Sequence, residues 1–78
     1  MDRTRKFIVI LEAEEGGGFT VRVPSLPEIV TYGEDEAEAL AMAEDAIRLV
    51  LDDCAARGEP APSGDPPRIR EVTVTLAA

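Results

Sequence analysis

The pattern of apolar and polar positions predicts three short strands in the first part of the chain. Phe7–Leu11 is apolar on both faces, which is typical of a central strand covered on two sides. Phe19–Val23 alternates strictly, and Ile29–Tyr32 is short and β-branched, so each predicts a further strand. Glycines at 16–18 can supply the positive φ of a tight turn, so the first two strands should form a hairpin.

A long helix is predicted from Glu36 to Arg57. Asp35 is suited to cap it, Glu38 completes a capping box three residues later, and Gly58 suits its C-terminal end. At 100° per residue one apolar stripe faces the core. This stripe consists of Leu40, Ala43, Ile47, Val50, Leu51 and Cys54, and a flanking strip contains Met42, Ala46 and Leu49.

A last strand is predicted at Ile69–Leu76, after a proline-rich, semi-rigid loop at 59–67. In a three-strand meander the third strand runs parallel to the first, and a right-handed crossover through the helix returns the chain to the free edge of the first strand. The expected fold is therefore one α+β domain over residues 1–78. Its order is β-β-β-α-β, with a four-stranded mixed sheet of order 3-2-1-4 and one helix packed on one face.

The net charge and the length of the chain limit the classes of partner that we expect. A chain of 78 residues folds as one domain with a thin core. Eight basic residues stand against sixteen acidic ones, giving a net charge of −8, which disfavours nucleic acid and suits a basic protein partner. The chain has no run of 18 apolar residues and no signal-peptide core, so we expect a cytoplasmic protein.

The candidate chemistry is sparse. The sequence contains no histidine, and Cys54 is its single cysteine, so a disulfide, a zinc site or a base-activated thiol is not expected. The carboxylates at 34–38 fit a helix cap and its dipole better than a cation site. We therefore expect no enzyme, catalytic residue, cofactor or metal. An enzyme with metal at this helix start is the alternative, and loss of an activity with a chelator would favour it.

Surplus apolar residues predict self-association. A single helix covers one sheet face only, which leaves apolar side chains for an interface. The candidate interface residues are Ile8, Ile10, Tyr32, Met42 and Leu49. We expect a homodimer or a higher homo-oligomer, with the alternative that the loop at 59–67 covers this surface.

Several short motifs together resemble the HicB-like antitoxin family in its short single-domain form, which lacks a C-terminal DNA-binding domain. They span about residues 5–57 and comprise Gly18 and Phe19, then Pro24, Leu26 and Pro27, then Gly33, and finally Glu38 and Ala39. The resemblance implies a partial ribonuclease-H-like fold. The first strand lacks the metal-binding aspartate of ribonuclease H, so nuclease activity is not expected.

The function implied by the resemblance is that of an antitoxin. Such a protein-binding module would neutralise a small basic RNA-cleaving toxin of the HicA type by occlusion, without chemistry and without direct binding to nucleic acid or membrane. The alternative is an orphan, self-associating domain that has no toxin partner and binds another protein or a small ligand. The sequence leaves open whether a cognate toxin exists and which surface would bind it.

Overall fold

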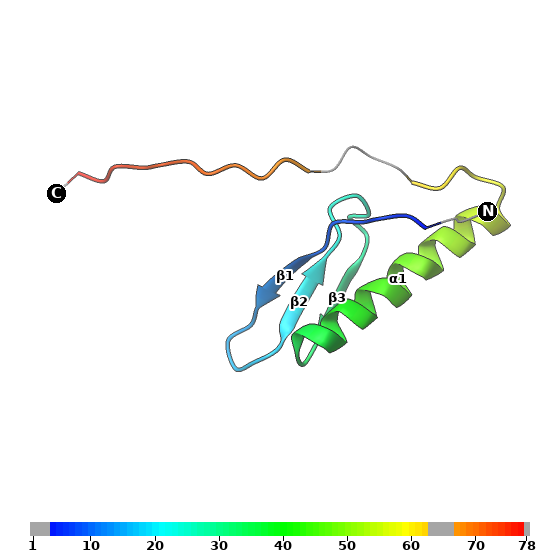
Figure 1. Cartoon of the computed structure of the whole chain (residues 1–78), viewed down its shortest axis with the longest axis horizontal. Coiled ribbons are helices and arrows are strands. Elements are labelled where there is room, and N and C mark those ends of the chain that lie inside the picture. The colour runs from blue at the N-terminus through cyan, green and yellow to red at the C-terminus, as the bar shows by residue number, and fades with distance from the viewer. Residues whose placement is uncertain (1–3, 63–66, 78) are drawn as a thin grey trace.

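The computed structural model describes residues 4–62 and 67–77 (Figure 1). Three strands, β1 (Ile10–Ala13), β2 (Phe19–Arg22) and β3 (Val30–Gly33), are followed by the helix α1 (Glu36–Ala56). The strands form one antiparallel sheet in the order β1-β2-β3. The helix covers one face of this sheet and contacts chiefly β3 and β2, which leaves the β1 side of that face less covered.

The core lies between this sheet face and the helix. Its centre is Val21, which pairs with Leu11 and Thr31 across the sheet and packs with Ala39 and Ala43 of the helix. A second cluster consists of Val23, Leu26 and Ile29, against which Phe7, Val9, Ala46, Ile47 and Val50 pack. Small residues on the helix therefore let it approach the sheet closely, and the larger apolar side chains close the core at one end.

Two local devices position these elements, as the sequence predicts. The hairpin turns through Gly16, Gly17 and Gly18, all with positive φ. At the helix start, Asp35 Oδ1 accepts a hydrogen bond from the Glu38 N–H at 2.7 Å, and Glu38 Oε1 accepts one from the Glu34 N–H at 3.3 Å. One orphan donor of the first helical turn, the Glu38 N–H, is thus satisfied by the side chain of the N-cap residue.

The corner between β2 and β3 is a pair of consecutive turns. The Leu26 N–H donates to the Val23 carbonyl and the Ile29 N–H donates to the Leu26 carbonyl, each at 2.9 Å. Prolines at 24 and 27 have no backbone N–H to donate, so this segment does not continue the hydrogen-bond ladder of the sheet. As a result Leu26 is turned into the core and is almost fully buried.

The prediction of a fourth strand in this sheet is wrong. Residues 67–77 are extended but pair with no strand of the described chain, and they run away from the body (Figure 1, orange to red). The architecture is a three-stranded antiparallel sheet followed by a helix, not a four-stranded mixed sheet of order 3-2-1-4. The radius of gyration is 15.8 Å, against about 11–12 Å for a compact chain of this length.

The physical reason is that alternation specifies an extended conformation but not a partner for its backbone. The first predicted strand illustrates the same limit, because its ladder begins at Ile10 while residues 7–9 are extended without pairing. The proline-rich loop reaches into residues 63–66, which lie outside the described residues.

Candidate interaction surfaces

The family motif residues build the junction between the sheet and the helix. Leu26 and Ala39 are buried, Glu38 caps the helix, and a Cβ on Gly33 would overlap the Ala39 backbone. Gly18 has φ +85°, and the Tyr32 ring occupies the space where its Cβ would lie. Phe19 packs against the central cluster. These motif residues therefore contribute to the fold.

The outer face of the sheet carries three of the five predicted interface residues. Ile10 lies across from Arg22, which lies across from Val30, and Tyr32 lies on the same face two residues further along β3. An ion pair of 2.7 Å between Arg22 Nε and Glu12 Oε1 crosses the face. Ile8, Ile10 and Tyr32 are exposed, and so is Val30, which the sequence analysis did not single out. Its spacing of two from Tyr32 would have identified it.

The other two predicted residues lie on the helix. Met42 and Leu49 are 42% and 71% exposed on a flank of α1, beside the buried stripe of Ala39, Ala43 and Cys54. Glu38, Asp45 and Asp52 recur every seven residues beside them and are exposed as well. Because the helix covers the opposite sheet face, the structure does not unite the five residues into one surface. They form an outer sheet surface and an outer helix surface.

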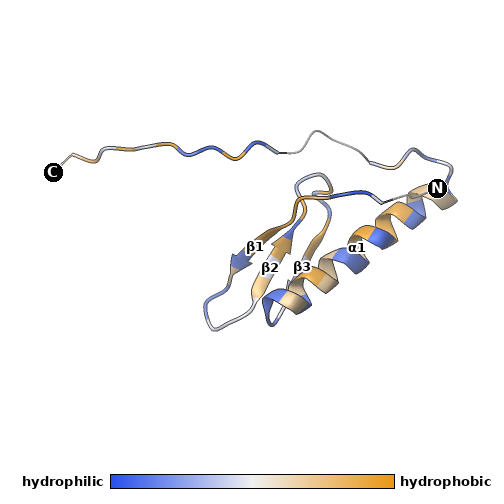
Figure 2. Ribbon diagram, in the orientation of Figure 1, coloured by the Kyte–Doolittle hydropathy of each residue, from blue (hydrophilic) through white to orange (hydrophobic). Residues whose placement is uncertain are grey.

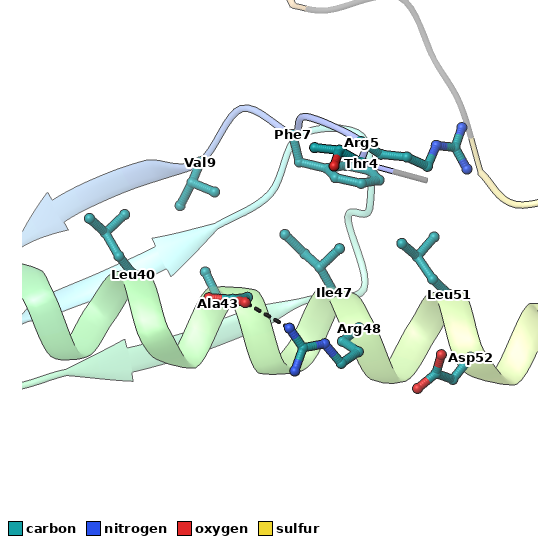
Figure 3. A pocket seen from close by; sticks show the side chains of 11 residues that line it. Thr4, Arg5, Phe7, Val9, Leu40, Ala43, Ile47, Arg48, Leu51 and Asp52 are labelled. Carbon is teal, nitrogen blue, oxygen red and sulfur yellow. Dashed lines mark hydrogen bonds and ion pairs between the residues drawn. The ribbon is translucent and has the colours of Figure 1, made fainter. Parts of the chain in front are cut away.

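A third surface was missed by the sequence analysis. A groove of about 510 Å³ runs between the N-terminal segment and the helix (Figure 3). Its apolar lining is Phe7 and Val9 on one side and Leu40, Ala43, Ile47 and Leu51 on the other. The ion pair of Arg48 with Glu44, 2.7 Å long, lies on its rim with Asp52. The predicted helix stripe contained these leucines but assigned them to the core, whereas Leu40 is 46% exposed.

The described residues offer little for catalysis. Cys54 is a buried free thiol, and no group of three or more histidine, cysteine, aspartate or glutamate side chains within residues 4–62 and 67–77 is placed to hold a metal ion. The carboxylates at the helix start are engaged in capping through Asp35 and Glu38. In the described part of the chain, α1 is too polar to cross a membrane. The features that stand out are surfaces for binding.

The chain is similar in sequence to known proteins. Over 69 residues the chain is 33% identical to a UPF0150 protein of Thermoplasma acidophilum, an alignment that covers 88% of this chain and 96% of that protein. Over 45 residues it is 42% identical to antitoxin HicB 1 of Photorhabdus laumondii, covering 58% of this chain and 29% of that protein.

The chain thus spans less than a third of HicB 1 and nearly all of the UPF0150 protein. No family model matches the sequence, and no solved structure matches it. The name of the Photorhabdus protein, an antitoxin, suggests a non-enzymatic role for that protein. Taken together, the motif residues at the sheet–helix junction and the two relatives show that this chain belongs to the HicB-like antitoxin family.

Proposed function

We propose that this chain is a protein-binding antitoxin that neutralises a small basic RNA-cleaving toxin of the HicA type by occluding it. The similarity to a protein named as an antitoxin supports the general role. The net charge of −8 supports a basic partner, since complementary charge steers association and selects the partner. The site of action would be the cytoplasm, where such a toxin meets its RNA.

The outer helix surface carries this proposal. It places two exposed apolar side chains, Met42 and Leu49, beside the carboxylates of Glu38, Asp45 and Asp52. Apolar anchors with a charged rim are the usual composition of an interface whose centre excludes water. A basic surface could cover the acidic rim while an apolar pocket received the two anchors.

The ion pairs within the body show which arginines already bind carboxylates of this chain. Arg22 pairs with Glu12, Arg48 pairs with Glu44, and Arg57 pairs with Asp53 and Glu59, at 2.7–3.3 Å. Three of the basic side chains are thus already engaged by carboxylates of this chain. Asp45 is in none of these pairs, and its charge is available to a partner.

Occlusion requires no chemistry from this chain. Binding would cover the RNA-contacting surface of the toxin and stay in place through the buried anchors, while the charges would speed the encounter. The antitoxin effect would therefore depend on the outer helix surface and on the stability of the body that presents it.

Co-expression with a small basic protein encoded beside this chain tests the proposal. We expect growth to be rescued from the toxin and the two proteins to co-purify. Asp45→Lys should slow association about tenfold or more at low salt, because it places like charges opposite each other. Glu15→Lys, the same change in the exposed hairpin turn, is the matched control and should have little effect. Equal effects of the two changes would contradict the assigned surface.

Failure to co-purify with any such basic protein would contradict the antitoxin role itself. Met42 and Leu49 provide an independent check on the surface, because they contribute no charge. Leu49→Ala should accelerate dissociation more than it slows association, since an apolar anchor acts after the encounter. An unchanged dissociation rate would place the contact elsewhere on the molecule.

A further inference from the structure

The C-terminal segment, residues 68–77, presents an apolar stripe with nothing against it. Val72, Val74 and Leu76 lie on one side of the extended chain, and Thr73 and Thr75 lie on the other. The apolar side chains are 71–84% exposed, which is unusual for three large aliphatic residues in a row on one face. Figure 2 shows this segment as alternating apolar and polar positions far from the body.

The body contains a groove that could receive this apolar stripe. The groove is open and lies between the N-terminal segment and the helix, and six of its eleven lining residues are apolar (Figure 3). β1 is the first strand of the sheet, so its outer edge has unpaired backbone groups. Leu40 projects over this groove while nearly half exposed. An extended segment with one apolar face is the shape that such a groove and edge would accept.

The segment does not occupy the groove of its own chain. The molecule is 57 Å long and 22 Å thin because the segment extends away from the body (Figure 1). The same sequence therefore carries a donor strand and an acceptor groove that are separated within one chain. A second copy offers the complementary pair, and two such contacts can close a symmetric dimer.

We propose that the C-terminal segment of one chain seats in the groove of a second copy, and that the exchange is reciprocal. Each chain contributes ten segment residues and eleven groove residues, which is the scale of a standard interface with about 20–30 residues per side. Arg68 and Arg70 precede the apolar stripe, and Glu44 and Asp52 lie on the groove rim. Arg5 and Arg48 also line the groove, so its charges balance, and the match rests on the apolar side chains.

This exchange shares only Asp52 with the outer helix surface. Leu40, Ile47 and Leu51 line the groove, whereas Met42 and Leu49 lie on the other side of the same helix. A dimer formed in this way leaves Met42 and Leu49 of both chains free. The exchange can therefore be tested on the protein alone, without any toxin.

Isotope-filtered nuclear Overhauser spectroscopy on a mixture of labelled and unlabelled full-length chains tests the proposal directly. We expect contacts between the Val74 methyl groups of one chain and the side chains of Phe7, Leu40 or Ile47 of the other. Contacts between these groups only within one chain would overturn the exchange, and so would their complete absence in a dimeric sample.

Light scattering across a dilution series provides the second measurement. We expect a dimer at high concentration, and Val74→Lys should raise the dissociation midpoint about tenfold or more, because it places a charge in an apolar groove. Thr75→Lys, the same change on the opposite face of the segment, is the matched control and should shift the midpoint little. Circular dichroism of both variants checks that the helix remains formed.

Two further outcomes would overturn the proposal. One is a monomer mass at every concentration. The other is a dimer that survives Val74→Lys but dissociates with Ile10→Lys, which would place the contact on the outer sheet surface. If Val74→Lys does not fold, the spectroscopic experiment on the unmodified chain still decides between exchange and its alternatives.

Discussion

Two segments of this chain have nearly the same sequence pattern and very different surroundings. β2 and the C-terminal segment both alternate apolar residues with threonine or arginine. Val21 of β2 is 0% exposed, whereas Val74 of the C-terminal segment is 71% exposed. The difference is one of neighbours, because β2 is joined to β1 by a tight turn and to β3 by a short corner.

The comparison shows what an alternating pattern specifies and what it leaves open. It selects an extended backbone with one apolar face, and this is what both segments adopt. A partner must be close in sequence, or be reached through a longer loop, before the pattern becomes a buried strand. The C-terminal segment follows a proline-rich stretch of sequence and pairs with no strand among residues 4–62 of its own chain.

Replacing one leucine in each region should give the largest contrast. Leu26→Ala removes an almost fully buried side chain, so the free energy of unfolding should fall by about 2–5 kcal/mol. Leu76→Ala removes an exposed side chain, and the loss should stay within about 0.5 kcal/mol in a sample dilute enough to be monomeric. Urea denaturation checks both values. Similar losses would mean that the C-terminal segment is buried in its own chain.

A methyl group at the junction of β3 and the helix should give the next largest effect. Gly33→Ala places a Cβ against the Ala39 backbone, which cannot move aside, so stability should fall by about 1–3 kcal/mol or more. Gly58→Ala, at the end of the helix, has open space around it and only its φ of +69° opposes the change. Its loss should be about 1 kcal/mol. A thermal melt that ranks them the other way would contradict the packing of this junction.

Removing the helix cap should have a moderate effect. Asp35→Ala deletes the acceptor for the Glu38 N–H and should lower the free energy of unfolding by about 1 kcal/mol. Asp35→Asn keeps an acceptor oxygen and should recover most of this loss. Helicity followed by circular dichroism during denaturation measures both variants. If Ala and Asn behave alike, the cap does not stabilise the body.

The smallest effect is expected on the groove rim. Glu44→Gln breaks an ion pair with Arg48 in which both side chains are more than half exposed, so stability should change by less than about 0.5 kcal/mol. Denaturation of a dilute sample is the measurement. A larger loss of stability would show that this ion pair helps to hold the body together. The contrast between a body that is stable by itself and an unpaired C-terminal segment would then need revision.

The local elements of the body could be predicted from the sequence because their causes are local. The glycines of the hairpin, the capping box at Asp35 and the end of the helix near Gly58 each depend on a few adjacent residues. Phe7, Val9 and Leu11 alternate with the predicted interface residues Ile8 and Ile10, and all three pack against the core.

The arrangement of distant elements could not be predicted in the same way. The helix lies over β2 and β3, so Leu40 and Leu51 line a groove instead of filling a core. The position of the last segment depends on which backbone pairs with β1, and no local pattern carries that information. Of the predicted interface residues, the structure places Ile10 and Tyr32 on the sheet and Met42 and Leu49 on the helix.

Amide hydrogen exchange at two protein concentrations tests the central contrast most directly. The amides of β2 should be protected to the same degree in dilute and concentrated samples, because their partners are in the same chain. The amides of Val72–Leu76 should exchange freely in the dilute sample and become protected in the concentrated one. Equal protection of both segments in a dilute, monomeric sample, or no protection of Val72–Leu76 at any concentration, would contradict the account.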